Sequence, residues 1–482
     1  MGISSVGVGS NILTQDVLDQ LRKADEAALI TPLTLSIANE KDKQAAFDTL
    51  DANMTNLIDS INEIKNATLF DEREATVNGT SIEMTADANS DVQEFTLDVQ
   101  RLATKEIVES GSFGSSSDVI ASADGYMEIS VGTASPIRVD YTAGMKLDEL
   151  KKAINDAAGD YVSASIVNIG SGDARLFISA KNSGDLSGDN TYDASGNLQS
   201  DDPDITINDV SGNLSDDGGT TGGGTKLTTG LVGVQTGEDA AFTYNGQSVT
   251  RSSNTFDDLV AGYNITLKEL GSSTVSVTQN RDAILEKIDS FVEKYNATMS
   301  ELGRLTKPST DPKERGIFSN ESAIKSMKSA LRNMMDNVGG GVGTLYDYGF
   351  DIDKDGKLSV DKDVINKKLD EDPKNVEAFF SGGDFTDASG TVTNVQGAFG
   401  ELYDIVDSYT SYNGMLNDFD TALSDRLSEL EESKLKATER LDAKYETLKK
   451  QFIAYDAMIA KLNNASSMFI ELANAQTASQ NN

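Results

Sequence analysis

The sequence contains no cysteine, no histidine and no tryptophan among its 482 residues. Without these side chains it cannot form a disulfide, a thiol nucleophile, a Ser-His-Asp triad or a zinc site of cysteine and histidine. A glycosidase that works with two carboxylates stays open in principle. However, aromatic residues make up only 6% of the chain, which leaves few rings to stack on a sugar. We therefore expect no enzyme and no cofactor.

Positive charge is also scarce, with 41 lysines and arginines against 78 acidic residues and a net charge of −37. Such a chain repels nucleic-acid phosphates and anionic lipid surfaces. No apolar run approaches the 18 residues of a membrane span, and MGISSVGVGSNILTQ at the start has neither the charge nor the apolar run of a Sec signal. We expect no nucleic-acid binding and no membrane insertion. The protein is then cytoplasmic or exported without a cleavable signal.

Helical periodicity is strong near the start of the chain. Apolar residues follow one another at spacings of 3, 4, 3, 4 and 3, as in a coiled coil, at Phe47, Leu50, Met54, Leu57, Ile61 and Ile64. We expect these residues to form core within the chain. A weaker series precedes them and should end near Pro32, which breaks the first helix: Ile12, Val17, Leu21, Ala24 and Ala28.

The other end predicts a much longer helix. Between Met415 and Ala475 there is no glycine or proline, and apolar residues recur at helical spacing throughout. A helix of about 60 residues would span about 90 Å at 1.5 Å per residue. It is too long to be covered by one compact domain, so we expect the N-terminal helices to pack against it.

Between about residues 75 and 280 the apolar period changes to two, which is typical of half-buried antiparallel strands. Asn78-Gly79 and Asn245-Gly246 predict hairpin turns. One amphipathic helix with an adjoining motif is expected at 145–158. Residues 182–224, rich in Gly, Ser, Asp and Thr, are interpreted as solvated loops.

The predicted fold class is therefore α+β and multidomain, with nested discontinuous domains. Paired N- and C-terminal helices form coiled-coil or bundle ends, and antiparallel β-rich lobes are inserted between them. The expected domains are terminal helical arms at 1–40 with 445–482, a helical bundle domain at 41–75 with 281–444, a β-rich domain at 76–105 with 235–280, and an outer β-rich domain at 106–234.

One short stretch, DIDKDGKLSVDK, resembles a calcium loop because Asp351, Asp353 and Asp355 alternate before Gly356. Its twelfth position should be a bidentate Glu but is Lys362, and glycines precede it where a helix is needed. We reject a metal site here. The pattern instead predicts a β-hairpin at 350–360 that pairs Ile352 with Leu358 and Phe350 with Val360, with Asp353 opposite Lys357 as a charge pair.

The two terminal arms have too little apolar surface to be stable alone. We therefore expect them to contact other subunits or a partner. The candidate contact residues are Ile12, Leu13, Val17, Leu21, Tyr445, Leu448, Phe452, Tyr455, Ile459, Leu462 and Phe469.

Four stretches resemble the flagellar filament cap proteins, the FliD-type hook-associated family. They are GISSVGVGSNILTQDVLDQL at the start, residues 240–296 with the turn RSSN and the helix end FVEKYN, residues 147–184 with the flagellin-type AIN motif, and residues 348–382. The usual Gly-Leu-Asp of the family's opening is Asn11-Ile12-Leu13 here. About 182–230 has no counterpart.

This resemblance implies a structural assembly protein at the tip of the bacterial flagellar filament, outside the cell. It would be exported through the flagellar type III channel without a cleaved signal. Its expected partners are itself, in a ring of about five or six subunits, flagellin, the flagellar export machinery, and an export chaperone on the C-terminal helix. The cap would retain flagellin and promote its folding and insertion.

Two other functions stay open from the residues. A flagellin-like filament or junction subunit would share the helical ends. A secreted adhesin would use the 106–234 lobe as a binding module, and this could also be a second role of a cap.

Overall fold

The structure is a computed structural model that describes residues 14–193, 196–200, 203–215, 225–228, 230–337, 339 and 341–480. The chain divides into two compact units, one of residues 1–69 with 281–482 and the other of residues 70–280. The predicted class is confirmed, because helices dominate both ends of the chain and antiparallel sheets its middle.

The first unit, which we call the helical unit, is built from two segments far apart in sequence. Its helices are α1 (Gln15–Leu29), α2 (Thr31–Lys65), α5 (Arg281–Leu305), α6 (Ser322–Asn337), η1 (Leu345–Tyr348), α7 (Lys362–Glu371), α8 (Pro373–Ser381), α9 (Ala398–Thr410) and α10 (Met415–Gln480). Its strands are β18 (Phe350–Ile352), β19 (Leu358–Val360), β20 (Gly383–Thr386) and β21 (Val392–Val395). The short α3 (Thr68–Asp71) lies where this unit passes into the next.

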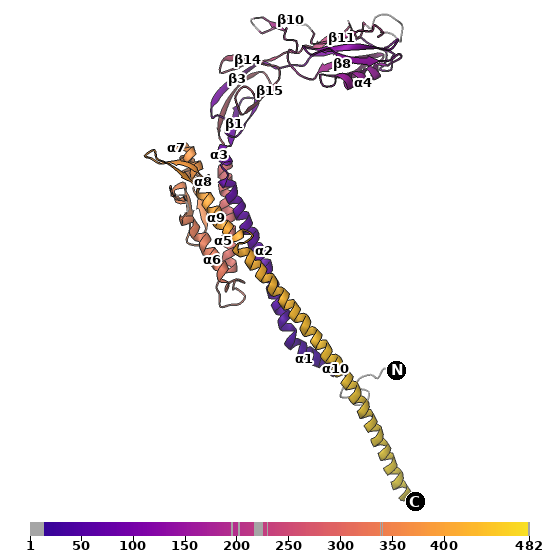
Figure 1. Cartoon of the computed structure of the whole chain (residues 1–482), viewed down its shortest axis with the longest axis vertical. Helices are drawn as coiled ribbons and strands as arrows, with labels where there is room; N and C mark the ends of the chain where they lie inside the picture. The colour runs from indigo at the N-terminus through magenta and orange to yellow at the C-terminus, as the bar shows by residue number, and fades with distance from the viewer. Residues whose placement is uncertain are drawn as a thin grey trace. The chain divides into compact units, whose positions relative to one another are not determined.

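Helix α2 carries the coiled-coil series, and all six of its predicted residues are buried. They face α5, α9 and α10, and Figure 1 shows α2 and α10 side by side. The predicted break is confirmed, because α1 ends at Leu29 and Pro32 lies in the first turn of α2, where its missing N–H costs nothing. The series is therefore core within this chain.

The centre of the helical unit is an aromatic cluster around Phe291 of α5. Its fully buried ring meets Phe399 of α9 edge-on, with ring centroids 4.9 Å apart, and Phe350 of β18 at 6.5 Å. Phe399 stacks in turn on Phe380 of α8 at 5.5 Å. One ring thus joins two helices and the β18–β19 hairpin.

That hairpin confirms the register predicted for the false calcium loop: Phe350 pairs with Val360 and Ile352 with Leu358. Gly356 takes the left-handed conformation, with φ +84°. Asp353 lies opposite Lys357, as predicted, and its N–H donates to the Lys357 carbonyl at 2.9 Å. The Asp353 carboxylate also accepts hydrogen bonds of 2.8 Å from the backbone N–H groups of Asp355 and Lys357. These bonds hold the pKa of Asp353 below its usual range.

The second unit, which we call the β unit, contains helix α4 (Leu147–Ala158) among its described residues. Its strands are β1 (Arg73–Asn78), β2 (Ile82–Ala86), β3 (Glu94–Arg101), β4 (Ile107–Glu109), β5 (Gly125–Val131), β6 (Ile137–Tyr141), β7 (Val162–Gly170), β8 (Asp173–Ala180), β9 (Thr191–Tyr192), β10 (Leu198–Ser200), β11 (Ile205–Asp209), β12 (Val232–Gln235), β13 (Ala240–Tyr244), β14 (Gln247–Arg251), β15 (Thr255–Phe256), β16 (Tyr263–Leu267) and β17 (Gly271–Gln279).

Two separate apolar cores lie in the β unit. The inner core forms between the sheets β1-β17-β3-β13-β14 and β15-β16-β2, and includes Phe95, Phe242 and Tyr263. The outer core forms from the sheets β11-β5-β6 and β12-β4-β8-β7 with α4, and includes Ile129 and Ile178. The period-two alternation predicted for this region is seen in strands β3, β5, β6, β8 and β17, each of which contributes buried alternate residues to one of these cores.

The two predicted Asn-Gly turns have different outcomes. Asn245-Gly246 forms the expected two-residue hairpin, with φ of +50° and +80°, between β13 and β14. Asn78-Gly79 does not form a hairpin. It leads from β1, which pairs with β17, to β2, which pairs with β16, so the turn carries the chain from one sheet to the other.

Four asparagines stabilise the fold in the same way, each accepting from the N–H and donating to the C=O of a single residue. The two bonds imitate a neighbouring strand at a place where none is present. All eight distances are 2.7 or 2.8 Å, and the pairs are Asn155 with Ala164, Asn254 with Ala103, Asn296 with Leu358, and Asn375 with Thr386. Three of these asparagines are the last residues of the RSSN, FVEKYN and AIN motifs. In each of these motifs the asparagine therefore has a structural role, which is to hold the backbone of a distant residue.

Candidate assembly surface

The candidate surface begins where α1 packs against α10. Leu18 of α1 is buried against Leu441 and Tyr445 of α10, and Leu448 and Phe452 flank this cluster. Such a small apolar contact is weak on its own, because few side chains leave water. Polar groups around it add to the contact.

Charged side chains surround the cluster on both helices. Arg22 forms ion pairs with Asp442 of α10, at 2.5 Å, and with Glu26 of its own helix, at 2.7 Å. Asp25 accepts from both Lys444 and the Tyr445 hydroxyl, each at 2.7 Å. The signs of charge therefore alternate between the helices, which fixes how α1 lies along α10.

These contacts change the pKa values of the groups that make them. The hydrogen bond from Lys444, and then that from Tyr445, lowers the pKa of Asp25. Burial, and then the hydrogen bond to Asp25, raises the pKa of Tyr445 from its ordinary 10 to about 12. Because the folded pKa is raised, the stabilisation from neutral Tyr445 is complete below pH 10 and is lost as the pH rises through about 12.

We expect Tyr445 to stay protonated at pH 10.5, where an ordinary tyrosine has largely ionised. The measurement is the phenolate absorbance of the wild-type chain minus that of Tyr445→Phe. Asp25→Ala should return the ionisation of Tyr445 toward pH 10, whereas Asp16→Ala, on the exposed side of α1, should not. Ordinary ionisation of Tyr445 in the wild-type chain would contradict the contact.

From residue 461 onward, no described part of the chain covers α10. Every residue from 461 to 477 is exposed, including Leu462, Phe469 and Ile470, and Phe469 is 73% exposed. An isolated helix gains nothing from burial, so exposed apolar residues along it indicate a surface that another chain covers. We define the exposed arm surface as Tyr455, Met458 and residues 461–472 of α10, together with the exposed residues Val17, Leu21, Ala24 and Ala28 of α1.

The structure places the predicted contact residues in three groups. Tyr445, Leu448 and Phe452 contact α1 within the chain, and Ile459 is half-buried. Val17, Leu21, Tyr455, Leu462 and Phe469 are exposed. Ile12 and Leu13 lie outside the described residues.

Sequence reasoning missed the residues that hold the two helices together. The predicted α1 series, Val17, Leu21, Ala24 and Ala28, forms its exposed side, whereas Leu18 and Asp25 face α10. A signal was present in the charges, because Arg22 and Asp25 complement Asp442 and Lys444. Apolar periodicity alone cannot find a face that is half charged.

No helix within the described ranges is long and apolar enough to cross a membrane. Over the same residues, no three acidic side chains are grouped so that they could hold a metal ion.

Family models match both ends of the chain. The model of the flagellar hook-associated protein 2 N-terminus matches residues 10–106, and that of its C-terminus matches residues 237–464. Together they cover more than half of the chain. The chain belongs to this family. The flagellin hook IN motif matches residues 127–182, which include Asn155 of the AIN motif.

Relatives with the same name extend over different lengths. Flagellar hook-associated protein 2 of Helicobacter pylori is 29% identical over 254 residues, which are 50% of this chain and 37% of the relative. The chain therefore spans little more than a third of that protein. The Escherichia coli protein of the same name is 26% identical over 482 residues, 96% of this chain and 97% of the relative.

A solved structure has the same fold. The crystal structure of the flagellar cap protein FliD D1-D2-D3 domains from Escherichia coli covers 79% of this chain and 99% of its own, with a TM-score of 0.56 and 22% identity.

Proposed function

We propose that the protein caps the distal tip of the bacterial flagellar filament, where it retains exported flagellin and promotes its folding and insertion. The observation that supports this most is the match of both the N-terminal and the C-terminal family model to one chain. The exposed arm surface would carry out the binding that this function needs, because its apolar side chains are free to pack against a second chain.

The role we propose is mechanical and not enzymatic. The exposed arm surface orders when it packs against flagellin or against neighbouring cap subunits, and the burial of Leu462 and Phe469 drives that ordering. In the free protein the described parts of the arms are held to each other by the Leu18–Tyr445 cluster and its ion pairs.

The remaining parts of the proposal rest on the family. A ring of about five or six subunits would form the cap, an export chaperone would bind the C-terminal helix, and the flagellar export machinery would carry the chain out. We further propose four domains: the arms, the helical bundle, and one domain around each of the inner and outer cores. These cores support the last two.

A strain that lacks the gene tests the proposal. We expect flagellin to appear in the medium as monomer and filaments to be absent, because nothing then holds flagellin at the tip. Restoring the full chain should restore filaments. Normal filaments in the deletion strain would contradict the cap function, and long filaments formed by the purified protein would point to a filament subunit instead.

A further inference from the structure

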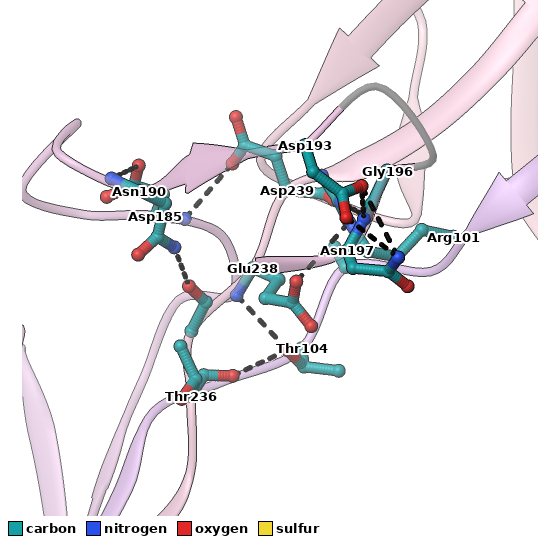
Figure 2. A network of polar contacts seen from close by, with 12 residues as sticks. Arg101, Thr104, Asp185, Asn190, Asp193, Gly196, Asn197, Thr236, Glu238 and Asp239 are labelled. Carbon is teal, nitrogen blue, oxygen red and sulfur yellow. Dashed lines mark hydrogen bonds and ion pairs between the residues drawn. The ribbon is translucent and has the colours of Figure 1, made fainter. Parts of the chain in front are cut away.

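Two stretches of chain join the inner and outer cores of the β unit, and they are tied to each other by polar contacts. Thr104 lies on one stretch and Thr236 and Glu238 lie on the other (Figure 2). The Thr104 N–H donates to the Glu238 carbonyl at 2.9 Å, and its hydroxyl donates to the Thr236 carbonyl at 2.7 Å. The same hydroxyl accepts from the Glu238 N–H at 3.1 Å. Thr104 therefore hydrogen-bonds the two stretches to each other, and we call this pair of stretches the joint.

A third segment, residues 181–193, lies across this joint, and we call it the strap. Its Gly184 N–H donates to the Thr104 carbonyl at 2.9 Å, and its Asn190 side chain donates to the Gly237 carbonyl at 2.8 Å. The strap belongs to the region that the sequence indicated only as solvated loop. In the structure it contacts both joining stretches.

On the outer side the strap is anchored by an apolar side chain as well as by hydrogen bonds. Leu186 packs against the outer core. The N–H groups of Leu186 and Ser187 donate to the Asp204 carboxylate at 3.1 and 2.7 Å, and the Asp204 N–H donates to Glu106 at 2.6 Å. The strap is therefore part of the outer core.

On the inner side the strap is held by polar contacts. The Ser183 hydroxyl donates to the Ser252 carbonyl at 2.7 Å, and the Asp185 N–H donates to the Asp239 carboxylate at 3.1 Å (Figure 2). Near the C-terminal end of the strap, Arg101 of β3 donates to the Asp239 carbonyl at 2.8 Å. The Arg101 guanidinium also lies over the ring of Tyr192 of the strap, 3.9 Å from the ring centroid.

The strap is thus held to the outer core by apolar packing as well as hydrogen bonds, but to the inner core by polar contacts. We propose that the strap is a latch that fixes the joint between the two cores, and that it opens on its inner side. The inner contacts are few and polar, and breaking them leaves the apolar packing of both cores in place. They can therefore be lost without unfolding either core. When they are lost, the strap stays with the outer core and the two cores move separately.

Two glycines of the strap provide a matched pair of variants. Gly184 and Gly188 both have positive φ, of +97° and +77°, so alanine strains the backbone at either position. A Cβ on Gly184 would lie 2.6 Å from the Cβ of Ser252 and 2.7 Å from an Asp239 carboxylate oxygen, whereas a Cβ on Gly188 meets no atom within 4 Å. Only Gly184→Ala pushes the strap off the inner side.

The experiment measures the distance between the cores in the full chain. Because the chain has no cysteine, Ser165→Cys on β7 and Ser248→Cys on β14 place one spin label on each core, and both positions are exposed. We expect one narrow distance distribution in the otherwise wild-type chain and in Gly188→Ala. In Gly184→Ala the distribution should be at least twofold wider.

Asp239→Ala is the second variant, because it removes the acceptor for the strap without adding bulk or backbone strain. It should also widen the distribution, while circular dichroism shows both variants folded. Narrow distributions in both variants would overturn the proposal. So would equal widening in Gly188→Ala, since the contact with the inner side would then not matter.

Discussion

Removal of residues 453–482 should abolish filament growth and leave the rest of the protein folded. The cut falls just after Phe452, so Leu18, Leu441 and Tyr445 keep their contact and α1 stays on α10. What is lost is the exposed stretch with Tyr455, Leu462 and Phe469. If that stretch orders against flagellin or neighbouring subunits, its loss removes the apolar burial that holds the cap on the filament.

The measurement is the number and length of filaments in a deletion strain that carries the shortened gene. We expect at least a tenfold loss of filaments, as in the strain without the gene. The amount of shortened protein outside the cell is measured in the same culture, so that failed export is distinguished from failed capping. Normal filaments from the shortened chain would contradict the role of the exposed arm surface.

Point variants separate the apolar side chains from the length of the helix. Leu462→Gln with Phe469→Gln removes two exposed apolar groups seven residues apart, on one side of α10. The matched control is Lys461→Gln with Glu471→Gln, which changes exposed polar residues nearby. We expect the first pair to reduce filament growth strongly and the control pair to leave it unchanged.

Much of the fold could be predicted because the spacing of apolar residues and the residue types that form turns determine structure within short segments. The 350–360 hairpin is one case, since its apolar positions are symmetric about Asp355 and Gly356 supplies the left-handed turn. Lys362, which argued against calcium there, forms an ion pair with Asp289 of α5. The same residue that excluded one function therefore attaches α7 to the bundle.

What could not be predicted depends on contacts between segments distant in sequence. Whether Asn78-Gly79 closes a hairpin depends on β16 and β17, nearly 200 residues away, which take the neighbouring strands as partners. The strap is similar, because Asp185 and Ser187 resemble any solvated loop until Asp204 and Asp239 are placed beside them. In the site, Leu18 was missed because its neighbours on the contact face are charged.

The FVEKYN motif contacts both strands of the β18–β19 hairpin. Asn296 holds the backbone of Leu358, and Phe291, five residues earlier, packs on Phe350 of the paired strand. The motif therefore fastens the β18–β19 hairpin twice, once by hydrogen bonds and once by a ring. Phe291 should matter more, because its ring also meets Phe399.

Phe291→Ala should accordingly destabilise the protein by about 3–5 kcal/mol, the usual cost of emptying a buried aromatic site. The measurement is urea unfolding followed by circular dichroism at a helical wavelength. Phe291→Leu refills most of the volume but loses the edge-on contacts, so it should cost about 1–2 kcal/mol.

Tyr412→Ala is the control, because this aromatic ring is 85% exposed and its removal should change stability by less than about 0.5 kcal/mol. The packing requires that stability increases in the order Phe291→Ala, Phe291→Leu, wild type. If Phe291→Ala cost no more than Tyr412→Ala, the ring could not be the link that joins α5, α9 and the hairpin. Asn296→Ala, which removes the two hydrogen bonds to Leu358, would then have to cause the larger loss of stability.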